Sequence, residues 1–338
     1  MRKNLVRVLC VISVLLAVTA LAFTACAPME RNVTGFAMGS SFSVDYSFSS
    51  DLSQDIRSLL AEIEESFSAT FDPSCVSRIN QAEAGVSVSL SEEEFFALTR
   101  AFSLAEETEN AFDPAILPLV KAWGFDPPYL YNGKIPPSSE TRASAMLLSD
   151  PALFSLDEAS FSISKSNDGA KLDLGGAMKG YAAEKVRDLL LEKGVSSALV
   201  NVGRTIAAVG EDVPIGVAPP RESAEDYILS FVLKEGEICA TSGDYERNYE
   251  SDGVLYHHIL DVSTGAPASS DLIAATVISK DGMLADAYAT AAVVFGSEKA
   301  TALLRAAGAR AILITREKKL ILCDVEVKIK DASYVIAA

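Results

Sequence analysis

A carboxylate and a hydroxyl in the segment Ala285-Asp-Ala-Tyr-Ala-Thr-Ala291 form a candidate metal site. Asp286 and Thr290 are four residues apart, so in a helix their side chains lie on one face. With a nearby backbone carbonyl they offer hard oxygen ligands that suit Mg²⁺, which keeps water and substrate phosphates as its other ligands. An aspartate near the start of a helix is also common as a capping residue, and this alternative stays open for Asp286.

A second candidate is the glycine-rich segment Lys171-Leu-Asp-Leu-Gly-Gly-Ala-Met-Lys-Gly-Tyr181, which has the pattern of a strand followed by a helix. Glycines let a ligand approach the backbone, and a helix N-terminus offers free N–H groups to a phosphate. Asp173 could accept hydrogen bonds from a ligand hydroxyl or ring N–H. The segment lacks the patterns of a P-loop and of a Rossmann turn. Taken alone, it is equally typical of an ordinary glycine turn.

Acid–base groups gather in Ala240-Thr-Ser-Gly-Asp-Tyr245 and Tyr256-His-His-Ile-Leu-Asp-Val-Ser-Thr-Gly-Ala-Pro267. His257 and His258 are the only histidines of the chain. A three-histidine zinc site and an HExxH helix are therefore excluded, and oxygen ligands must dominate any metal site. Either histidine could be a surface residue without a task, although the neighbouring Asp261 favours a role.

The overall composition is that of a globular protein with a sizeable core, because 49% of the 338 residues are hydrophobic and 22% are charged. The length suits one large domain or two closely joined ones. There are 46 acidic and 29 basic residues, which give a formal charge of −17. A nucleic-acid-binding surface needs clustered basic residues, so we expect no nucleic acid as a partner.

Hydrophobic periodicity predicts the elements that must position these groups. A strand is predicted over Phe42–Tyr46 and a helix over 56–67, and a capping box at Ser91 and Glu94 begins a second helix. Further helices are predicted over 177–193, 284–295 and 298–307. Predicted strands cover 198–202, 215–218, 227–233, 274–279, 310–315 and 320–323. The fold class that follows is α+β, with mostly antiparallel strands packed with helices in two closely associated lobes.

The N-terminus has the pattern of an export signal. Three basic residues precede an apolar run from Val8 to Phe23 that is shorter than a membrane-spanning helix, and small residues then precede Cys26. This resembles a bacterial lipobox, with Phe23 where leucine is preferred; an uncleaved anchor is the alternative. We expect a lipoprotein signal peptide over 1–25, a tether over 26–32 and a single functional domain over 33–338. Removing the signal takes away three bases and no acids, so the formal charge becomes −20. Anchoring would then depend on lipid at Cys26.

Disulfide bonds are not expected in the exported chain. Besides Cys26, it would keep only Cys75, Cys239 and Cys323, an odd and widely scattered set. The last two have apolar neighbours, which predicts packing in the core.

Together these segments resemble the ApbE family of FAD:protein FMN transferases over nearly the whole exported chain. The blocks that carry the resemblance are Met38-Gly39-Ser40, Phe71-Asp72 through Ser77-Arg78-Ile79-Asn80, Ala111-Phe112-Asp113-Pro114 with Pro118-Leu119-Val120 and Trp123-Gly124-Phe125, and the patterns D-L-G-G-x-x-K-G, T-S-G-D-Y, H-I-x-D-x-x-T-G-x-P and D-A-x-A-T-A. The family's fold is the two-lobed α+β arrangement expected above.

The resemblance implies Mg²⁺-dependent transfer of FMN from FAD to a threonine or serine hydroxyl of a target protein, with release of AMP. It also implies a metal site at Asp286 and Thr290, with the backbone carbonyl of Gly176 as third ligand, and His258 as the catalytic residue. His257 has no position in the pattern. The implied flavin contacts are Met38, Phe71, Ala111, Phe112, Asp113, Asp173, Lys179 and Ile259. The implied location is the outer side of a bacterial cell membrane, through lipid on Cys26.

The sequence departs from the family pattern at three places. Phe71 replaces a tyrosine, so ring stacking can persist without the phenolic hydrogen bond. Arg204 and Thr205 replace a glycine and an acid or amide, so that turn must differ in shape; Arg204 either offers a fork to phosphate or blocks the usual contact. Ala115 replaces a threonine. Two other functions therefore stay open: a metal-dependent FAD pyrophosphatase that gives FMN and AMP, and a flavin-binding lipoprotein without catalysis.

Overall fold

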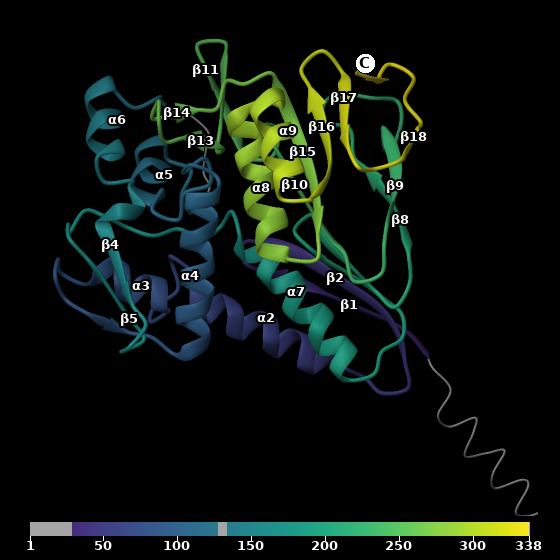
Figure 1. The fold of residues 1–338 in the computed structure, drawn as a ribbon, viewed down its shortest axis with the longest axis horizontal. Helices are drawn as coiled ribbons and strands as arrows, with labels where there is room; N and C mark the ends of the chain where they lie inside the picture. Colours follow the sequence, from purple (N-terminus) through teal and green to yellow (C-terminus); the bar gives the residue numbers. More distant parts are fainter. Residues whose placement is uncertain (1–28, 128–133, 338) are drawn as a thin grey trace, which may run out of the picture.

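The structure is a computed structural model that describes residues 29–127 and 134–337 (Figure 1). The predicted signal peptide and Cys26 lie outside the described residues. Within them the largest element is a nine-stranded sheet of order β1-β2-β6-β7-β10-β15-β16-β17-β19. All its neighbouring strands are antiparallel except β17 and β19. Its strands are β1 Met29–Ala37, β2 Ser40–Phe48, β6 Ala198–Val202, β7 Thr205–Val209, β10 Ile238–Gly243, β15 Leu272–Ser279, β16 Arg310–Thr315, β17 Lys319–Cys323 and β19 Val335–Ile336.

Smaller sheets and eight α-helices complete the described part of the chain. The sheets are β8 Val213–Val217, β9 Leu229–Leu233 and β18 Val327–Ile329; β3 Val88–Ser89, β4 Phe154–Asp157 and β5 Ser162–Lys165; and the hairpins β11 Asn248–Ser251 with β12 Val254–His257, and β13 Leu260–Asp261 with β14 Ala266–Pro267. The helices are α2 Ser53–Phe67, α3 Cys75–Gln81, α4 Glu92–Glu107, α5 Leu117–Trp123, α6 Ser139–Met146, α7 Met178–Glu192, α8 Gly282–Phe295 and α9 Ser297–Ala306.

Both faces of the large sheet are buried, which explains why its central strands are continuously apolar. In β16, Ala311 and Leu313 belong to the core under α7 and α8, whereas Ile312 and Ile314 face the β8-β9-β18 sheet. The alternation follows from the two-residue period of a strand. The sheet is thus the middle layer between helices and a second sheet (Figure 1).

The helical side of the molecule is where the candidate residues gather. Helix α8 packs on β10 and β15, and α7 packs on α8, β6 and β7. In Figure 1, helices α3 to α6 and strands β4 and β5 lie together on the far side of α8 from the large sheet. The predicted α+β class with mostly antiparallel strands is confirmed. One continuous core joins the two lobes, because Leu98 of α4 and Val44 of β2 belong to the same cluster.

Helices α7 and α8 approach each other through glycines. A Cβ atom on Gly180 would lie 1.8 Å from the backbone oxygen of Gly282, and only 3.1 Å from Cβ of Asp286. No side chain fits there without separating the two helices, since the colliding atom is backbone. This contact brings the start of α7 next to Asp286 on α8.

The predicted elements recur with shifted ends, and the tether is shorter than expected. Strand β1 begins at Met29, so residues 29–32 of the predicted tether are paired with β2. Only Val33 and Ala37 of β1 are buried, which is why its sequence gives a weak strand signal. Among the residues described, no helix is long and apolar enough to cross a membrane. The three described cysteines, Cys75, Cys239 and Cys323, are free and buried; burial was predicted for Cys239 and Cys323 but not for Cys75.

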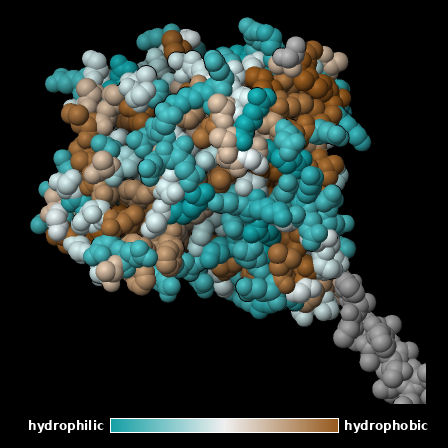
Figure 2. Space-filling model, in the orientation of Figure 1, coloured by the Kyte–Doolittle hydropathy of each residue, from teal (hydrophilic) through white to brown (hydrophobic). Residues whose placement is uncertain are grey.

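The surface in the view of Figure 1 is mostly polar. Figure 2 shows hydrophilic side chains across the middle of this face, while hydrophobic ones gather where Figure 1 draws β17 and β18. The edge strand β19 contributes exposed Val335 and Ile336. These apolar groups therefore lie at a sheet edge, away from α7 and α8.

Candidate functional site

Asp286 and Thr290 lie on one face of α8, as their spacing predicts. Asp286 is 3% exposed, and its Oδ2 accepts a hydrogen bond from Gly180 N at 3.2 Å. Gly180 is in the first turn of α7, where backbone N–H groups have no partner within the helix. The cap of α8 itself is Asp281, whose carboxylate accepts from Leu284 N. Asp286 is therefore not the cap of its own helix; it faces the start of α7.

The double-glycine segment meets Thr290 at the same place. A Cβ atom on Gly176 would lie 3.6 Å from Oγ1 of Thr290 and 3.2 Å from the Phe112 ring. Oγ1 of Thr290 also shares a hydrogen bond with Oγ of Ser242 at 3.1 Å. The turn before α7, the face of α8 and the end of β10 thus converge, and each of the three belongs to a candidate segment of the sequence analysis.

This donor set fits a hard divalent cation. Within the described residues, no group of three or more His, Cys, Asp or Glu side chains could hold a metal. A metal here would have one carboxylate, Asp286, together with the Thr290 hydroxyl and the Gly176 carbonyl. Such oxygen-only sites with few protein ligands are typical of Mg²⁺, which completes its shell with water and phosphate oxygens.

Charged side chains surround the Asp286 carboxylate. Lys179 Nζ lies 3.7 Å from Asp286 Oδ2 and donates a hydrogen bond to Gly175 O at 2.8 Å. Glu246 is a close neighbour: burial raises its pKa, while Arg204, Lys179 and Arg247 oppose the rise. A site with these cations can accept an anionic group such as a pyrophosphate.

His258 is held with one ring nitrogen free for proton transfer. Its backbone N donates to Arg247 O at 2.9 Å, and its Nδ1 lies 3.2 Å from the same oxygen. Because a carbonyl can only accept, Nδ1 carries the proton and Nε2 keeps its lone pair. Burial, and then the charges of Arg247, His257 and Lys179, lower the pKa of His258 to about 3, so the ring is neutral at pH 7. A neutral ring with a free Nε2 is the form that can take a proton.

Asp113 is a buried carboxylate with one unused oxygen. It is 3% exposed; Oδ1 accepts from Ala115 N at 2.6 Å, and Oδ2 has no hydrogen-bond partner in the part of the chain described. Burial raises the pKa of Asp113 to about 7, and Asp150 adds to the rise. An orphaned acceptor of this kind is costly unless a ligand donor fills it. The flanking Ala111 and Phe112 are also buried.

Replacing Asp113 should therefore change how stability depends on pH. The folded protein keeps a proton on Asp113 between about pH 4 and 7 that the unfolded chain has released, so the contribution of Asp113 to stability falls as the pH rises through this window, whereas the lowered pKa of His258 contributes with the opposite sign. We expect the Asp113→Asn variant to differ from the wild type by the Asp113 contribution, because the amide has no charge to bury. Urea unfolding of the free protein from pH 4 to pH 8 measures it. The same slope in both proteins would contradict the assignment.

Hydrogen bonds tie three of the family blocks together. Asp173 N donates to Pro114 O at 2.8 Å, and the Asn80 side chain pairs with both the N and O atoms of Leu172 at 2.6 and 2.9 Å. Asp173 Oδ1 accepts from Gly175 N at 2.8 Å, which shapes the double-glycine turn. The structure thus places Asp173 between the Asp113 segment and the metal-type donors.

The remaining predicted contacts surround this centre at different depths. Met38 is in the β1–β2 turn and has φ 54°. Ser40, at the start of β2, and Lys179 each have side-chain atoms within 3.1 Å of a Cβ atom placed on Gly203. Ile259 is buried in the main core directly after His258. Phe71 is 42% exposed in the loop between α2 and α3.

Arg204, which replaces a usual glycine, contacts Tyr245 and Glu246. Arg204 has φ 75°, a left-handed conformation that glycine adopts without strain. Its guanidinium lies 5.2 Å from the ring centroid of Tyr245, and its Nε lies 3.4 Å from Glu246 Oε1. Arg204 is thereby held over the T-S-G-D-Y block. Its position beside Glu246 could not be read from the sequence, and neither could the Ser242–Thr290 hydrogen bond.

The comparison with known proteins points to one family. The profile of the ApbE family matches residues 38–313. A Klebsiella pneumoniae protein named FAD:protein FMN transferase is 34% identical over 280 residues, which cover 82% of this chain and 86% of the relative. A Treponema pallidum protein of the same name is 32% identical, with 79% and 78% covered.

Solved structures give the same result. The ApbE protein of Thermotoga maritima matches with a TM-score of 0.77 and 30% identity, covering 90% of this chain and 97% of that one. The apo flavinyl transferase ApbE of Pseudomonas stutzeri matches with a TM-score of 0.74 and 30% identity, covering 86% and 92%. The chain therefore belongs to the ApbE family.

Proposed function

We propose that this protein is a Mg²⁺-dependent FAD:protein FMN transferase, which moves FMN from FAD to a threonine or serine hydroxyl of a target protein and releases AMP. The observation that carries the proposal is the convergence of Asp286, Thr290 and the Gly176 turn, with Lys179 and the neutral His258 as neighbours. The relatives named FAD:protein FMN transferase support the proposal, since each aligns with about four-fifths of this chain.

The reaction follows from the positions of these groups. The acceptor hydroxyl oxygen attacks the FMN phosphorus, its proton passes to Nε2 of His258, and the bond from that phosphorus to the bridging oxygen breaks, so that AMP leaves with the electron pair. Phosphoryl transfer of this kind depends mainly on positioning and electrostatics. A bound Mg²⁺ would supply charge neutralisation on the pyrophosphate. Lys179 adds a fixed positive charge beside Asp286.

One incubation separates this function from its two alternatives. The purified protein is mixed with FAD, Mg²⁺ and a candidate acceptor protein, and the products are followed by mass spectrometry, with EDTA as the metal control. Covalent FMN on the acceptor with equimolar AMP supports the transferase. Free FMN with AMP would instead show a pyrophosphatase, and unchanged bound FAD would show a flavin-binding protein without catalysis.

We also propose that the exported protein is anchored to the cell membrane by lipid on Cys26. Only two residues separate Cys26 from the start of β1 at Met29, so the edge of the large sheet would be held close to the bilayer. The exported chain, whose formal charge would be −20, has no excess of basic residues to bind anionic lipid. We expect Cys26→Ser to move the protein from the membrane fraction to the soluble fraction of a bacterial expression host. An unchanged distribution would contradict lipid anchoring.

A further inference from the structure

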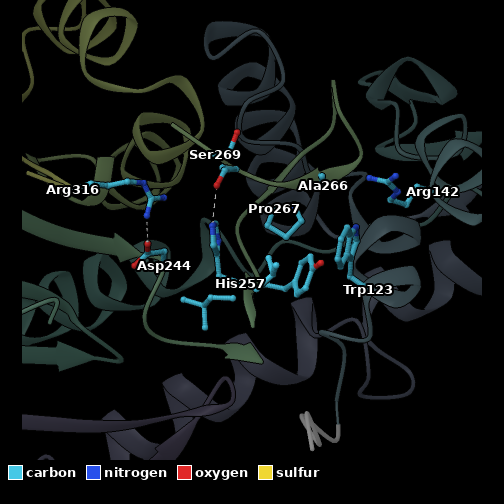
Figure 3. A pocket seen from close by; sticks show the side chains of 12 residues that line it. Trp123, Arg142, Asp244, His257, Ala266, Pro267, Ser269 and Arg316 are labelled. Atoms are coloured by element: carbon cyan, nitrogen blue, oxygen red, sulfur yellow. Dashed lines mark hydrogen bonds and ion pairs between the residues drawn. The ribbon is translucent and has the colours of Figure 1, made fainter. Parts of the chain in front are cut away.

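A second feature of the molecule is a cavity of about 340 Å³ next to the reaction centre. Figure 3 shows it with Arg316 and Asp244 on one side, His257 in the middle, and Trp123 and Arg142 on the other side. None of the residues implied to bind FAD or metal lines it. The cavity therefore needs an explanation of its own.

His257 presents an unused acceptor in this cavity. It is 4% exposed, and its Nε2 lies 2.9 Å from Ala268 O, so Nε2 carries the proton. Nδ1 is then a bare lone pair, and it has no hydrogen-bond partner within the described residues. Burial lowers the pKa of His257, which keeps the ring neutral. A ligand N–H or O–H would satisfy Nδ1.

The guanidinium of Arg142 is a cation without a partner in the described residues. Its Nε is buried without a hydrogen-bond partner, and no ion pair involves its guanidinium in the part of the chain described. On the opposite side, Arg316 and Arg221 share the single carboxylate of Asp244, with N–O distances of 2.8 to 3.1 Å. The cavity is thus lined by two arginines, Arg142 and Arg316, and by one aspartate, Asp244, which Arg221 also neutralises from outside the lining. This local excess of positive charge in an acidic chain favours an anionic group in the cavity.

The rest of the wall is apolar and rigid. The Trp123 and Tyr256 rings lie 5.3 Å apart, and Trp123 Nε1 is already bonded to Gly265 O at 2.8 Å. Strand β12 leads from this wall to the surface, where Val254 and Leu255 are 50% and 46% exposed. These two exposed side chains form an apolar rim beside the charged pocket, which a bound protein segment could bury but a small free anion could not.

Two covalent neighbours connect the cavity to the reaction centre. His257 precedes His258, so their Cα atoms are about 3.8 Å apart. Asp244 is two residues beyond Ser242, whose hydroxyl is bonded to Thr290. The cavity is therefore lined by residues that are covalently continuous with residues of the reaction centre.

We propose that this cavity binds the segment of the target protein that carries the accepting hydroxyl, with a carboxylate side chain of that segment on Arg142 and an N–H or O–H donor on Nδ1 of His257. The inference rests on the proposed transferase function, because it names how that function selects its acceptor. The exposed apolar rim favours a protein segment over a free small anion.

Binding can be tested without FAD or metal, because Trp123 is the only tryptophan of the chain. The probes are synthetic peptides that contain one threonine and one aspartate, and the position of the aspartate differs from peptide to peptide. In the matched control peptides asparagine replaces the aspartate. We expect an aspartate peptide to change Trp123 fluorescence and to bind about tenfold more weakly to Arg142→Gln, while Arg142→Lys restores part of the affinity. Arg305→Gln, on the exposed face of α9, is the control with the same loss of charge. A fluorescence response to AMP but not to any aspartate peptide would overturn the proposal.

Kinetics with a flavinylated acceptor distinguish this inference from the proposed function. We expect Arg142→Gln to raise the KM for the acceptor about tenfold and to leave the KM for FAD unchanged. Equal changes in both KM values would indicate a structural role and would overturn the inference. If no acceptor gains FMN at all, the transferase proposal fails, whereas the fluorescence titration still decides whether aspartate peptides bind at Arg142.

Discussion

The Asp286→Asn variant is expected to lose Mg²⁺-dependent turnover by about 10³-fold. The amide oxygen can still accept from Gly180 N, so the packing of α7 on α8 should persist. What disappears is the only carboxylate among the three metal-type donors. Loss of about 4 kcal/mol of charge stabilisation corresponds to this factor in rate. The measurement is AMP release from FAD as a function of Mg²⁺ concentration.

A matched control is Asp281→Asn on the same helix. Asp281 caps α8 and pairs with Arg100 at 2.9 Å, but it has no contact with Thr290 or the Gly176 turn in the described residues. Asparagine caps a helix as well as aspartate does, so we expect this variant to keep the cap, to lose at most about 1 kcal/mol of stability with the Arg100 ion pair, and to leave the Mg²⁺ dependence unchanged. FAD binding to Asp286→Asn, followed by flavin fluorescence, should partly persist. Normal turnover in Asp286→Asn would rule out its metal role.

The sequence predicted the elements that carry the site because those elements are long or strongly patterned. The periodicity over 284–295 and the capping box at Ser91 correspond to α8 and α4, and the capping box has both of its hydrogen bonds. Strand β1 was missed because seven of its nine residues are not buried, so its alternation carries little signal. The two-residue strand β3 is too short to show any period.

At the site, local patterns predicted which residues matter but not what they contact. The spacing of Asp286 and Thr290 placed them on one face, yet the capping alternative for Asp286 could be decided only from the structure, in which Asp281 is the cap of α8. The partner that Asp286 has instead, Gly180 N, depends on the glycine contact between α7 and α8, which joins residues 180 and 282. The unused atoms of Arg142 and His257 are likewise products of tertiary packing, so no motif could indicate them.

Charge balance explains how one small region can hold an anion and a metal together. In the free protein Lys179 and Gly180 N share Oδ2 of Asp286, so that carboxylate already has partners when no ligand is present. Arg204 and Arg247 balance the neighbouring Glu246. An incoming pyrophosphate would meet fixed cations on one side and a carboxylate suited to Mg²⁺ on the other. The substitution of a usual glycine by Arg204 therefore adds positive charge here without leaving it unpaired.

The His258→Ala variant is expected to slow FMN transfer by about 10²- to 10⁴-fold, the usual range for loss of a general base. The reason is the hydrogen bond of Nδ1 to Arg247 O, which leaves Nε2 as the atom that can take the acceptor proton. FAD affinity should change little, so the loss falls on the maximal rate. Flavinylation of the acceptor under saturating FAD and Mg²⁺, followed by mass spectrometry, measures it.

The pH profile separates a proton-transfer role of His258 from a merely structural one. Burial and neighbouring cations lower its pKa in the free protein, so the wild-type rate should fall only at pH values below the ordinary histidine range. A bound pyrophosphate opposes the nearby positive charges and should move this fall to higher pH. The Ala variant should lack the acidic fall altogether, because no imidazole remains to be protonated. If its profile keeps the wild-type shape at a lower rate, His258 does not accept the proton.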